Sequence, residues 1–190
     1  MIGTHEIELA RYCIEYAIKG GASAARLSLN KNVMDAYTIL NGEFDKVSHS
    51  ADRSIYLYLF VDGRYGTFST NRLEKKELED FISQAIVMVR MLGEDELRRL
   101  PDVGRTAKDA STGLELGLCD PAYESYTSEQ RLERAKSMSR FKSYAPNDRY
   151  TVLSEECEYA ESSDDTLLID SQGFEGRHRE TSFNCFAEVT

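Results

Sequence analysis

The sequence predicts an α+β fold, in which an antiparallel β-meander packs against long helices and a second unit of one helix and several strands follows. Three observations predict it. Residues 54–70 alternate apolar and other side chains at a period of two around an Asp62-Gly63 pair, which is typical of a β-hairpin. Residues 78–92 carry apolar side chains at helical spacing. After residue 127 a helical pattern and strand patterns recur in separate blocks, as in other α+β chains.

The N-terminal region predicts a helix followed by strands. Apolar side chains recur every three or four positions in residues 5–19, at Ile7, Ala10, Ile14, Ala17 and Ile18. Gly20-Gly21 predicts the end of this helix, because glycine readily adopts the left-handed conformation found there. Strands are expected at residues 27–30 and 34–40, and Asn41-Gly42 predicts a hairpin that returns along residues 43–48.

The central hairpin has two apolar faces. Ile55, Leu57, Leu59 and Val61 point one way, and Tyr56, Tyr58 and Phe60 point the other. The helix that follows is expected to cover one face. The other face needs a cover from the first helix, from another part of the chain or from a partner.

The helix after the hairpin has the longest apolar stripe in the sequence. The stripe consists of Leu78, Phe81, Ile82, Ala85, Ile86, Val89 and Leu92. Asn71 and Glu74, three residues apart, resemble a capping box at its start.

The second half of the chain begins with a segment that has no clear periodicity. We expect an N-terminal domain at residues 1–100, a connector at 101–127 and a second unit at 128–190. Within that unit, Thr127 and Gln130 predict a capping box for a helix that ends before Pro146. Strands follow at residues 150–161, 166–170 and 174–189, with a polar turn at residues 162–165. Because the last strand pattern runs into Thr190 without a turn signal, we expect this unit to be truncated.

Composition excludes several classes of protein. The formal net charge of −10 and the pI of about 4.9 disfavour sequence-independent binding of nucleic acid, and Arg177-His178-Arg179 is the one compact basic cluster. Four cysteines without a CxxC pair are typical of reduced thiols, so a cytoplasmic location is expected. The N-terminus has no signal-peptide pattern, and no apolar run approaches the roughly 20 residues of a membrane span.

Few residues suggest chemistry, and we predict no catalytic, cofactor-binding or metal-binding residue in this chain. His5-Glu6 resembles the start of a zinc-binding helix, but Leu9 and Ala10 stand where the second histidine would be. His49 and His178 lie far away in the sequence, and Cys13 lies beside Ile14 on a helix face that we expect to be core.

Paired carboxylates and a glycine pair also have plain structural interpretations. Asp164-Asp165 and Glu155-Glu156 are neighbours along the chain, and neighbours in a strand point to opposite faces, so neither makes a shared site unless it lies in a turn. Gly63 and Gly66 lack the strand-loop-helix context of a phosphate-binding loop.

Several stretches of this chain resemble the N-terminal region of the TldD/PmbA family, whose members are often labelled modulators of DNA gyrase. The resemblance lies in residues 40–48 and 61–71 and in the helix after them. Later pieces agree in order: Leu100-Pro101, residues 120–123, the helix at residues 128–144 and residues 169–174.

The resemblance implies part of a zinc-dependent metallopeptidase that acts on unfolded peptides inside a chamber formed by paired subunits. The family's metal motif is a His-Glu-x-x-x-His helix, with a further ligand in the C-terminal half. No position here matches that motif, so zinc is expected in the C-terminal half of the parent protein and this segment is expected to form scaffold. A homodimer or heterodimer with a second family subunit is expected, without direct contact to nucleic acid or membrane. The alternative is a freestanding, non-catalytic protein-interaction module.

Overall fold

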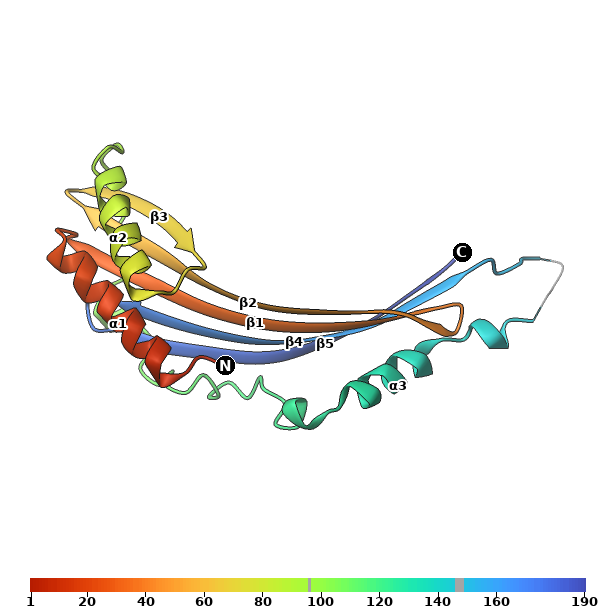
Figure 1. Cartoon of the computed structure of the whole chain (residues 1–190). Coiled ribbons are helices and arrows are strands. Elements are labelled where there is room, and N and C mark those ends of the chain that lie inside the picture. Colours follow the sequence, from red (N-terminus) through yellow and green to blue (C-terminus); the bar gives the residue numbers. More distant parts are fainter. Residues whose placement is uncertain (96, 146–148) are drawn as a thin grey trace. The chain divides into compact units, whose positions relative to one another are not determined.

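The computed structural model describes residues 1–95, 97–145 and 149–190. These residues form the helices α1 (Thr4–Lys19), α2 (Lys75–Val89) and α3 (Ser128–Met138). They also form the strands β1 (Ala24–Leu40), β2 (Glu43–Val61), β3 (Arg64–Thr70), β4 (Glu155–Asp170) and β5 (Glu175–Val189). Short 3-10 turns occur at Val103–Arg105, Tyr123–Ser125 and Phe141–Ser143. The strands form one sheet in the order β3-β2-β1-β4-β5 (Figure 1), which confirms the predicted α+β class.

Hydrogen bonds show that the sheet is antiparallel. β2 and β3 pair antiparallel from Ile55↔Thr70 to Val61↔Arg64. The Asn41 N–H donates to the Glu155 carbonyl at 2.8 Å, and the Ser171 N–H donates to the Ala25 carbonyl at 2.9 Å, so β1 and β4 run in opposite directions. β4 therefore returns beside β1 after a long excursion of the chain, which the sequence pattern did not predict.

The two predicted tight turns are confirmed. Asn41 and Gly42 have φ values of 53° and 79°, and Asp62 and Gly63 have φ values of 49° and 73°. Positive φ at both central residues is the geometry that joins two antiparallel strands with the correct twist.

The predicted number and length of the strands are wrong. Each of three pairs of short predicted strands is a single long strand in the structure. Residues 27–30 and 34–40 belong to β1, residues 43–48 and 54–61 belong to β2, and the predicted polar turn at residues 162–165 lies inside β4. The polar side chains there have partners: Ser162 is hydrogen-bonded to Ser182 at 3.0 Å, and buried Asp165 binds Arg177. A strand accepts such residues when each buried polar group is satisfied. Residues 150–154, predicted as strand, precede β4.

The helix ends agree only in part with the predicted signals. Gly20 closes α1, and Gly21 follows with a φ of 103°, as expected. The predicted capping box of Asn71 and Glu74 is wrong, because α2 starts at Lys75 with Glu74 at its N-cap and no side-chain cap. For α3 the capping box is confirmed: the Thr127 N–H donates to Gln130 Oε1 at 2.8 Å, and the Gln130 N–H donates to Thr127 Oγ1 at 3.2 Å. Pro146, the predicted stop, lies outside the described residues.

The chain divides into two compact units. Unit 1 consists of Met1–Lys31, Asp52–Gly117 and Asp164–Arg179, and unit 2 consists of Asn32–Ala51, Leu118–Ser163 and Glu180–Thr190. Both units are discontinuous in sequence. The sequential division at residues 100 and 127 stays a prediction.

Unit 1 has an apolar core between its sheet and two helices. The face of β2 that carries Ile55, Leu57, Leu59 and Val61 lies in one buried cluster with α1 and α2. From the helices the cluster includes Ala10, Cys13, Ile14, Ala17, Leu78, Ile82, Ala85, Ile86 and Val89. This confirms that α2 covers the central hairpin. On the opposite face of β2, Tyr58 and Phe60 line a cavity together with Arg98–Leu100, so another part of the chain covers part of that face.

Unit 2 has a smaller core beneath α3. Tyr37 and Ile39 of β1 and Cys157 and Tyr159 of β4 are buried against Ala135 of α3. Leu132 and Met138, on the same helix, pack around this cluster.

Candidate functional site

The three histidines do not come together. His5 is exposed in the first turn of α1 in unit 1, and His178 lies on β5 in the same unit. His49 is exposed on β2 in unit 2, where its Nδ1 lies 2.8 Å from Asp35 Oδ1. Glu6, the neighbour of His5, binds Lys31 Nζ at 2.8 Å and accepts the Gly3 N–H at 2.8 Å. Glu6 therefore ties down the start of α1.

Cys13 lies in the core of unit 1, as its position on the helix predicts. The side chain is fully buried, and this burial, with the charge of Glu79 added, raises the pKa of its thiol to about 12. The thiol is therefore protonated at neutral pH and is a poor nucleophile.

The adjacent carboxylates point to opposite faces of β4, as expected for a strand. Asp165 and Glu155 are buried, whereas Glu156 is exposed. Asp165 accepts hydrogen bonds from Arg177 Nη2 at 2.6 Å, from Arg177 Nε at 2.8 Å and from the Ile2 N–H at 2.7 Å. Arg177 of the predicted basic cluster is thus committed to an internal carboxylate and anchors the N-terminus.

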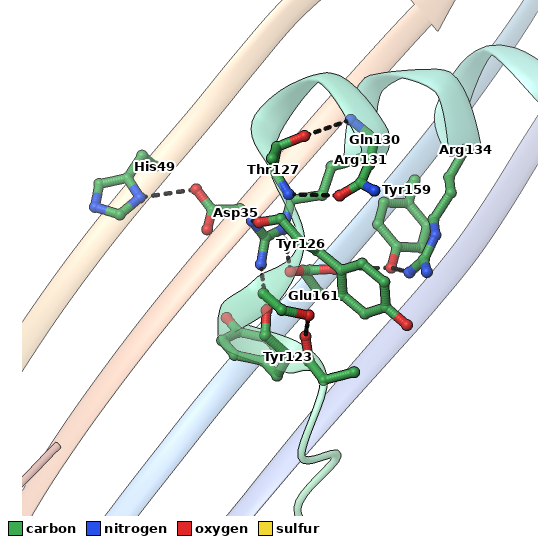
Figure 2. Close-up of polar contacts among 12 residues, drawn as sticks. Asp35, His49, Tyr123, Tyr126, Thr127, Gln130, Arg131, Arg134, Tyr159 and Glu161 are labelled. Atoms are coloured by element: carbon green, nitrogen blue, oxygen red, sulfur yellow. Dashed lines mark hydrogen bonds and ion pairs between the residues drawn. The ribbon is translucent and has the colours of Figure 1, made fainter.

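A group of interacting polar side chains lies under the start of α3 in unit 2 (Figure 2). It consists of Asp35, His49, Tyr123, Tyr126, Arg131, Arg134, Tyr159 and Glu161. The capping box of Thr127 starts α3 immediately beside it. From there, Arg131 and Arg134, three residues apart, reach from one side of the helix toward β4.

Arg131 and Glu161 form a buried ion pair at the centre of this group. The Arg131 side chain is 11% exposed and that of Glu161 is 3% exposed, and Arg131 Nε donates to Glu161 Oε1. Arg131 also donates to the carbonyl oxygens of Tyr126 at 2.5 Å and of Tyr123 at 3.0 Å. One guanidinium therefore fixes the backbone of Tyr123 and Tyr126 to β4.

Burial and charge act in opposite directions on Arg131. Burial alone would lower the pKa of its guanidinium, but the hydrogen bond and the negative charge of Glu161 outweigh burial, and the pKa is raised. Asp35 adds to the effect through its negative charge. The Arg131 guanidinium therefore stays charged.

Tyr159 links the ion pair to Arg134. Its hydroxyl donates to Glu161 Oε2 at 2.7 Å and accepts from Arg134 Nη1 at 3.0 Å. Burial and the bond to Glu161 raise the pKa of Tyr159, against the opposing effect of Arg134. The Arg134 guanidinium also lies 3.9 Å from the centroid of the Tyr126 ring, a cation–π contact.

A shallow cavity of about 560 Å³ lies beside this group on the outer side of α3. Its lining is Tyr126, Glu129, Gln130, Glu133, Arg134 and Ser137. Both oxygens of Glu161 and the hydroxyl of Tyr159 are engaged in hydrogen bonds within this group. The group joins α3 and the residues before it to β4.

Sequence reasoning missed this group. One signal was available: Glu161 follows Glu155, Cys157 and Tyr159 at a period of two, on the face of β4 that is buried throughout. Its partner, 30 residues earlier on another element, could not be identified from the pattern.

The described residues do not fit a zinc site. A protein zinc site needs three or four ligands drawn from His, Cys, Asp or Glu. No group of three such side chains lies close enough together in the described part of the chain. The pair of His49 and Asp35 supplies two such ligands. Among the same residues, no helix is long and apolar enough to cross a membrane.

Comparison with known proteins identifies the family. Residues 25–89 match the model of PmbA/TldA metallopeptidase domain 1. A candidate modulator of DNA gyrase from Bacteroides thetaiotaomicron VPI-5482 is 32% identical, and the match covers 100% of this chain and 42% of that chain with a TM-score of 0.89. Among curated proteins, none matches.

Two further solved structures share the fold. TldE from Thermococcus kodakarensis is 15% identical over 95% of this chain and 39% of that chain, with a TM-score of 0.68. A candidate modulator of a DNA gyrase from Thermotoga maritima MSB8 is 14% identical, with a TM-score of 0.64. The match covers 97% of this chain and 43% of that chain. The chain thus spans less than half the length of each of these relatives. The domain match and the 32% identity along the whole chain show that this chain resembles the N-terminal region of PmbA/TldD proteins and contains domain 1 of that metallopeptidase family.

Proposed function

We propose that this chain is the N-terminal scaffold and assembly portion of a zinc-dependent metallopeptidase of the PmbA/TldD type, which acts on unfolded peptides. The observation that carries the proposal is the match of the whole chain to 42% of a family member, together with the domain 1 match over β1 to α2. In this proposal the zinc ligands and the catalytic residues belong to the C-terminal half of the parent protein.

The architecture supports a scaffold role. Arg131 and Glu161 fasten the connector to the sheet in unit 2, and Arg177 and Asp165 fasten the N-terminus in unit 1. Both pairs are internal and hold backbone in place. Elements fastened within each unit suit the wall of a chamber, built with a second family subunit as a homodimer or a heterodimer in the cytoplasm.

The coding region downstream of the Thr190 codon tests the proposal first. We expect the reading frame to continue and to encode a His-Glu-x-x-x-His helix. A reading frame that stops at Thr190, with a stably folded product, would count heavily against the proposal.

Zinc content and peptidase activity test it next. We expect the 190-residue chain, dialysed after exposure to zinc, to contain far less than one zinc per chain and to leave an unfolded casein substrate intact. The longer protein should bind zinc and cleave the same casein substrate. Its activity should be lost on chelation and regained when zinc is added. Stoichiometric zinc and chelator-sensitive cleavage by the 190-residue chain itself would overturn the proposal.

A second candidate function is a freestanding, non-catalytic interaction module. Exposed apolar side chains on β2 and β5 of unit 2 favour it: Phe44, Val47, Phe183 and Phe186, of which Phe183 is 74% exposed. Such side chains are typical of surfaces that bind another protein. Light scattering and the fluorescence of a hydrophobic dye test this function. A chain that is strictly monomeric and does not bind the dye would exclude it.

A further inference from the structure

A cavity of about 310 Å³ lies in unit 1, on the face of the sheet opposite to α1 and α2. Tyr58 and Phe60 of β2, Tyr65 of β3 and Leu168 of β4 form its apolar lining, together with Leu100, which is buried. The rings of Phe60 and Tyr65 lie 5.1 Å apart, centroid to centroid. The volume lies at the lower end of the range for small-ligand sites, about 300–1,000 Å³.

Three arginines, Arg26, Arg98 and Arg99, line the same cavity. Arg26 Nη2 lies 3.2 Å from Asp170 Oδ2, but its Nε is buried without a hydrogen-bond partner among the described residues. Arg98 lies over the ring of Tyr65 at 5.2 Å and 3.5 Å from Asp95. Arg99 makes no ion pair or hydrogen bond within the part of the chain that the structure describes.

The cavity therefore holds an excess of positive charge in a chain whose formal net charge is −10. Asp170 does not balance it fully, because its Oδ1 also accepts the N–H groups of Gln172 at 2.9 Å and Phe174 at 3.2 Å. A buried guanidinium N–H without an acceptor is costly, and an incoming oxyanion would relieve that cost. Guanidinium groups bind carboxylates through paired N–H donors.

We propose that this cavity binds a carboxylate attached to an apolar or aromatic group, such as a free N-acylated amino acid or the C-terminal residue of a peptide. The arginines would bind the carboxylate and the aromatic walls would cover the apolar group. An inorganic phosphate would satisfy the arginines but would leave the apolar lining uncovered. The inference goes beyond the proposed function and does not depend on it, since it stands on this cavity alone.

Titration of the isotope-labelled 190-residue chain with N-acetylphenylalanine, followed by NMR, tests the proposal. We expect saturable shifts of the backbone amides of Tyr58, Phe60 and Leu168. The amide of the same compound, which lacks the carboxylate, should bind about tenfold more weakly or worse. Inorganic phosphate should bind more weakly than N-acetylphenylalanine. A short peptide that ends in phenylalanine, compared with the free compound, decides between the two sources of the carboxylate.

Arginine variants localise the site. Arg99→Ala should weaken binding of N-acetylphenylalanine about fivefold, and Arg99→Lys should weaken it less because the charge is kept. Arg53→Ala is the matched control: it removes the same charge from an exposed position of β2 that does not line the cavity, and it should change the affinity less than twofold.

Three results would overturn the proposal. The first is a folded chain without shifts at the three amides at millimolar ligand. The second is equal binding of the amide or of phosphate. The third is an equal loss of affinity in Arg99→Ala and Arg53→Ala, which would indicate a general effect of net charge.

Discussion

Unit 1 and unit 2 bury different kinds of side chains beneath their helices. Under α1 and α2 the sheet contributes leucine, isoleucine and valine, whereas under α3 a small apolar cluster lies beside the ion pair of Arg131 and Glu161. Apolar burial stabilises without fixed geometry, but a buried ion pair stabilises only when both partners are in place. The stability of unit 1 should therefore depend mainly on the apolar volume that it buries. The stability of unit 2 should depend mainly on its buried ion pair.

The largest effect should follow the loss of volume in unit 1. Leu57→Ala removes a side chain that is 1% exposed at the centre of the sheet, and we expect the free energy of unfolding to fall by about 4 kcal/mol. Urea denaturation followed by circular dichroism measures it. Met88→Ala, at an exposed position of α2, is the control, with a loss of less than about 0.5 kcal/mol. A loss below about 1 kcal/mol for Leu57→Ala would contradict a volume-dependent core.

Breaking the ion pair tests whether unit 2 depends on pairing. Arg131→Met leaves Glu161 buried without its cation, and we expect a loss of about 3 kcal/mol in the same assay. Adding Glu161→Leu should restore part of that loss, because no unpaired carboxylate is then buried, while the Tyr159 hydroxyl and two backbone carbonyls still lack their partners. Lys136→Met, in a surface pair with Glu133, should cost about 0.5 kcal/mol or less. If the double variant were less stable than Arg131→Met, the pairing argument would be wrong.

Unit 1 also contains a buried ion pair, Asp165 and Arg177, whose contribution to stability should depend on pH. Burial alone would raise the pKa of Asp165, but the hydrogen bonds from Arg177 and from the Ile2 N–H outweigh burial, and the pKa is lowered. The stabilisation is thus complete above the ordinary carboxyl pKa of about 4 and is lost as the pH falls through the lower folded-state value.

Asp165→Asn should therefore cost about 2 kcal/mol at pH 7 and progressively less as the pH falls below about 4. Melting temperatures of the two proteins between about pH 2.5 and 7 measure this convergence. Asp80→Asn, at an exposed position of α2, should follow the wild-type curve. A constant difference between Asp165→Asn and wild type across that range would mean that the charge of Asp165 is not involved.

The smallest effect concerns the start of α3. Thr127→Ala removes the side-chain cap that accepts the Gln130 N–H, and we expect a loss of about 1 kcal/mol in urea denaturation. Ser128→Ala, one residue further and exposed, should have almost no effect. Equal losses in the two variants would mean that the capping box does not stabilise unit 2.

Local signals in the sequence predicted local structure well. The turns at Asn41-Gly42 and Asp62-Gly63, the stop at Gly20-Gly21 and the capping box of Thr127 depend on neighbours within a few residues, and all four are confirmed. The α+β class follows from periodicity and is confirmed. The helix stripes are confirmed except at Ile18 and Leu92, which are exposed, and Leu92 lies beyond the end of α2.

Structure that depends on distant partners could not be predicted. Residues 162–165 have the composition of a turn, but Arg177 and Ser182 on β5 satisfy them, so the strand continues through them. The polar group under α3 likewise needs β4 beside β1 and the helix above it, a pairing between residues more than 100 positions apart. The arginine-lined cavity brings together residues as far apart in sequence as Arg26 and Leu168.

The anchoring of Ile2 has a consequence for the very beginning of the chain. Its N–H donates to Asp165 Oδ2 at 2.7 Å in a buried setting, and its carbonyl accepts from Arg177 Nη2 at 2.9 Å in a partly buried one. Exposed amides without a hydrogen bond exchange their hydrogens with solvent at once. The amide of Ile2 should instead exchange slowly, because opening it breaks a buried hydrogen bond to Asp165.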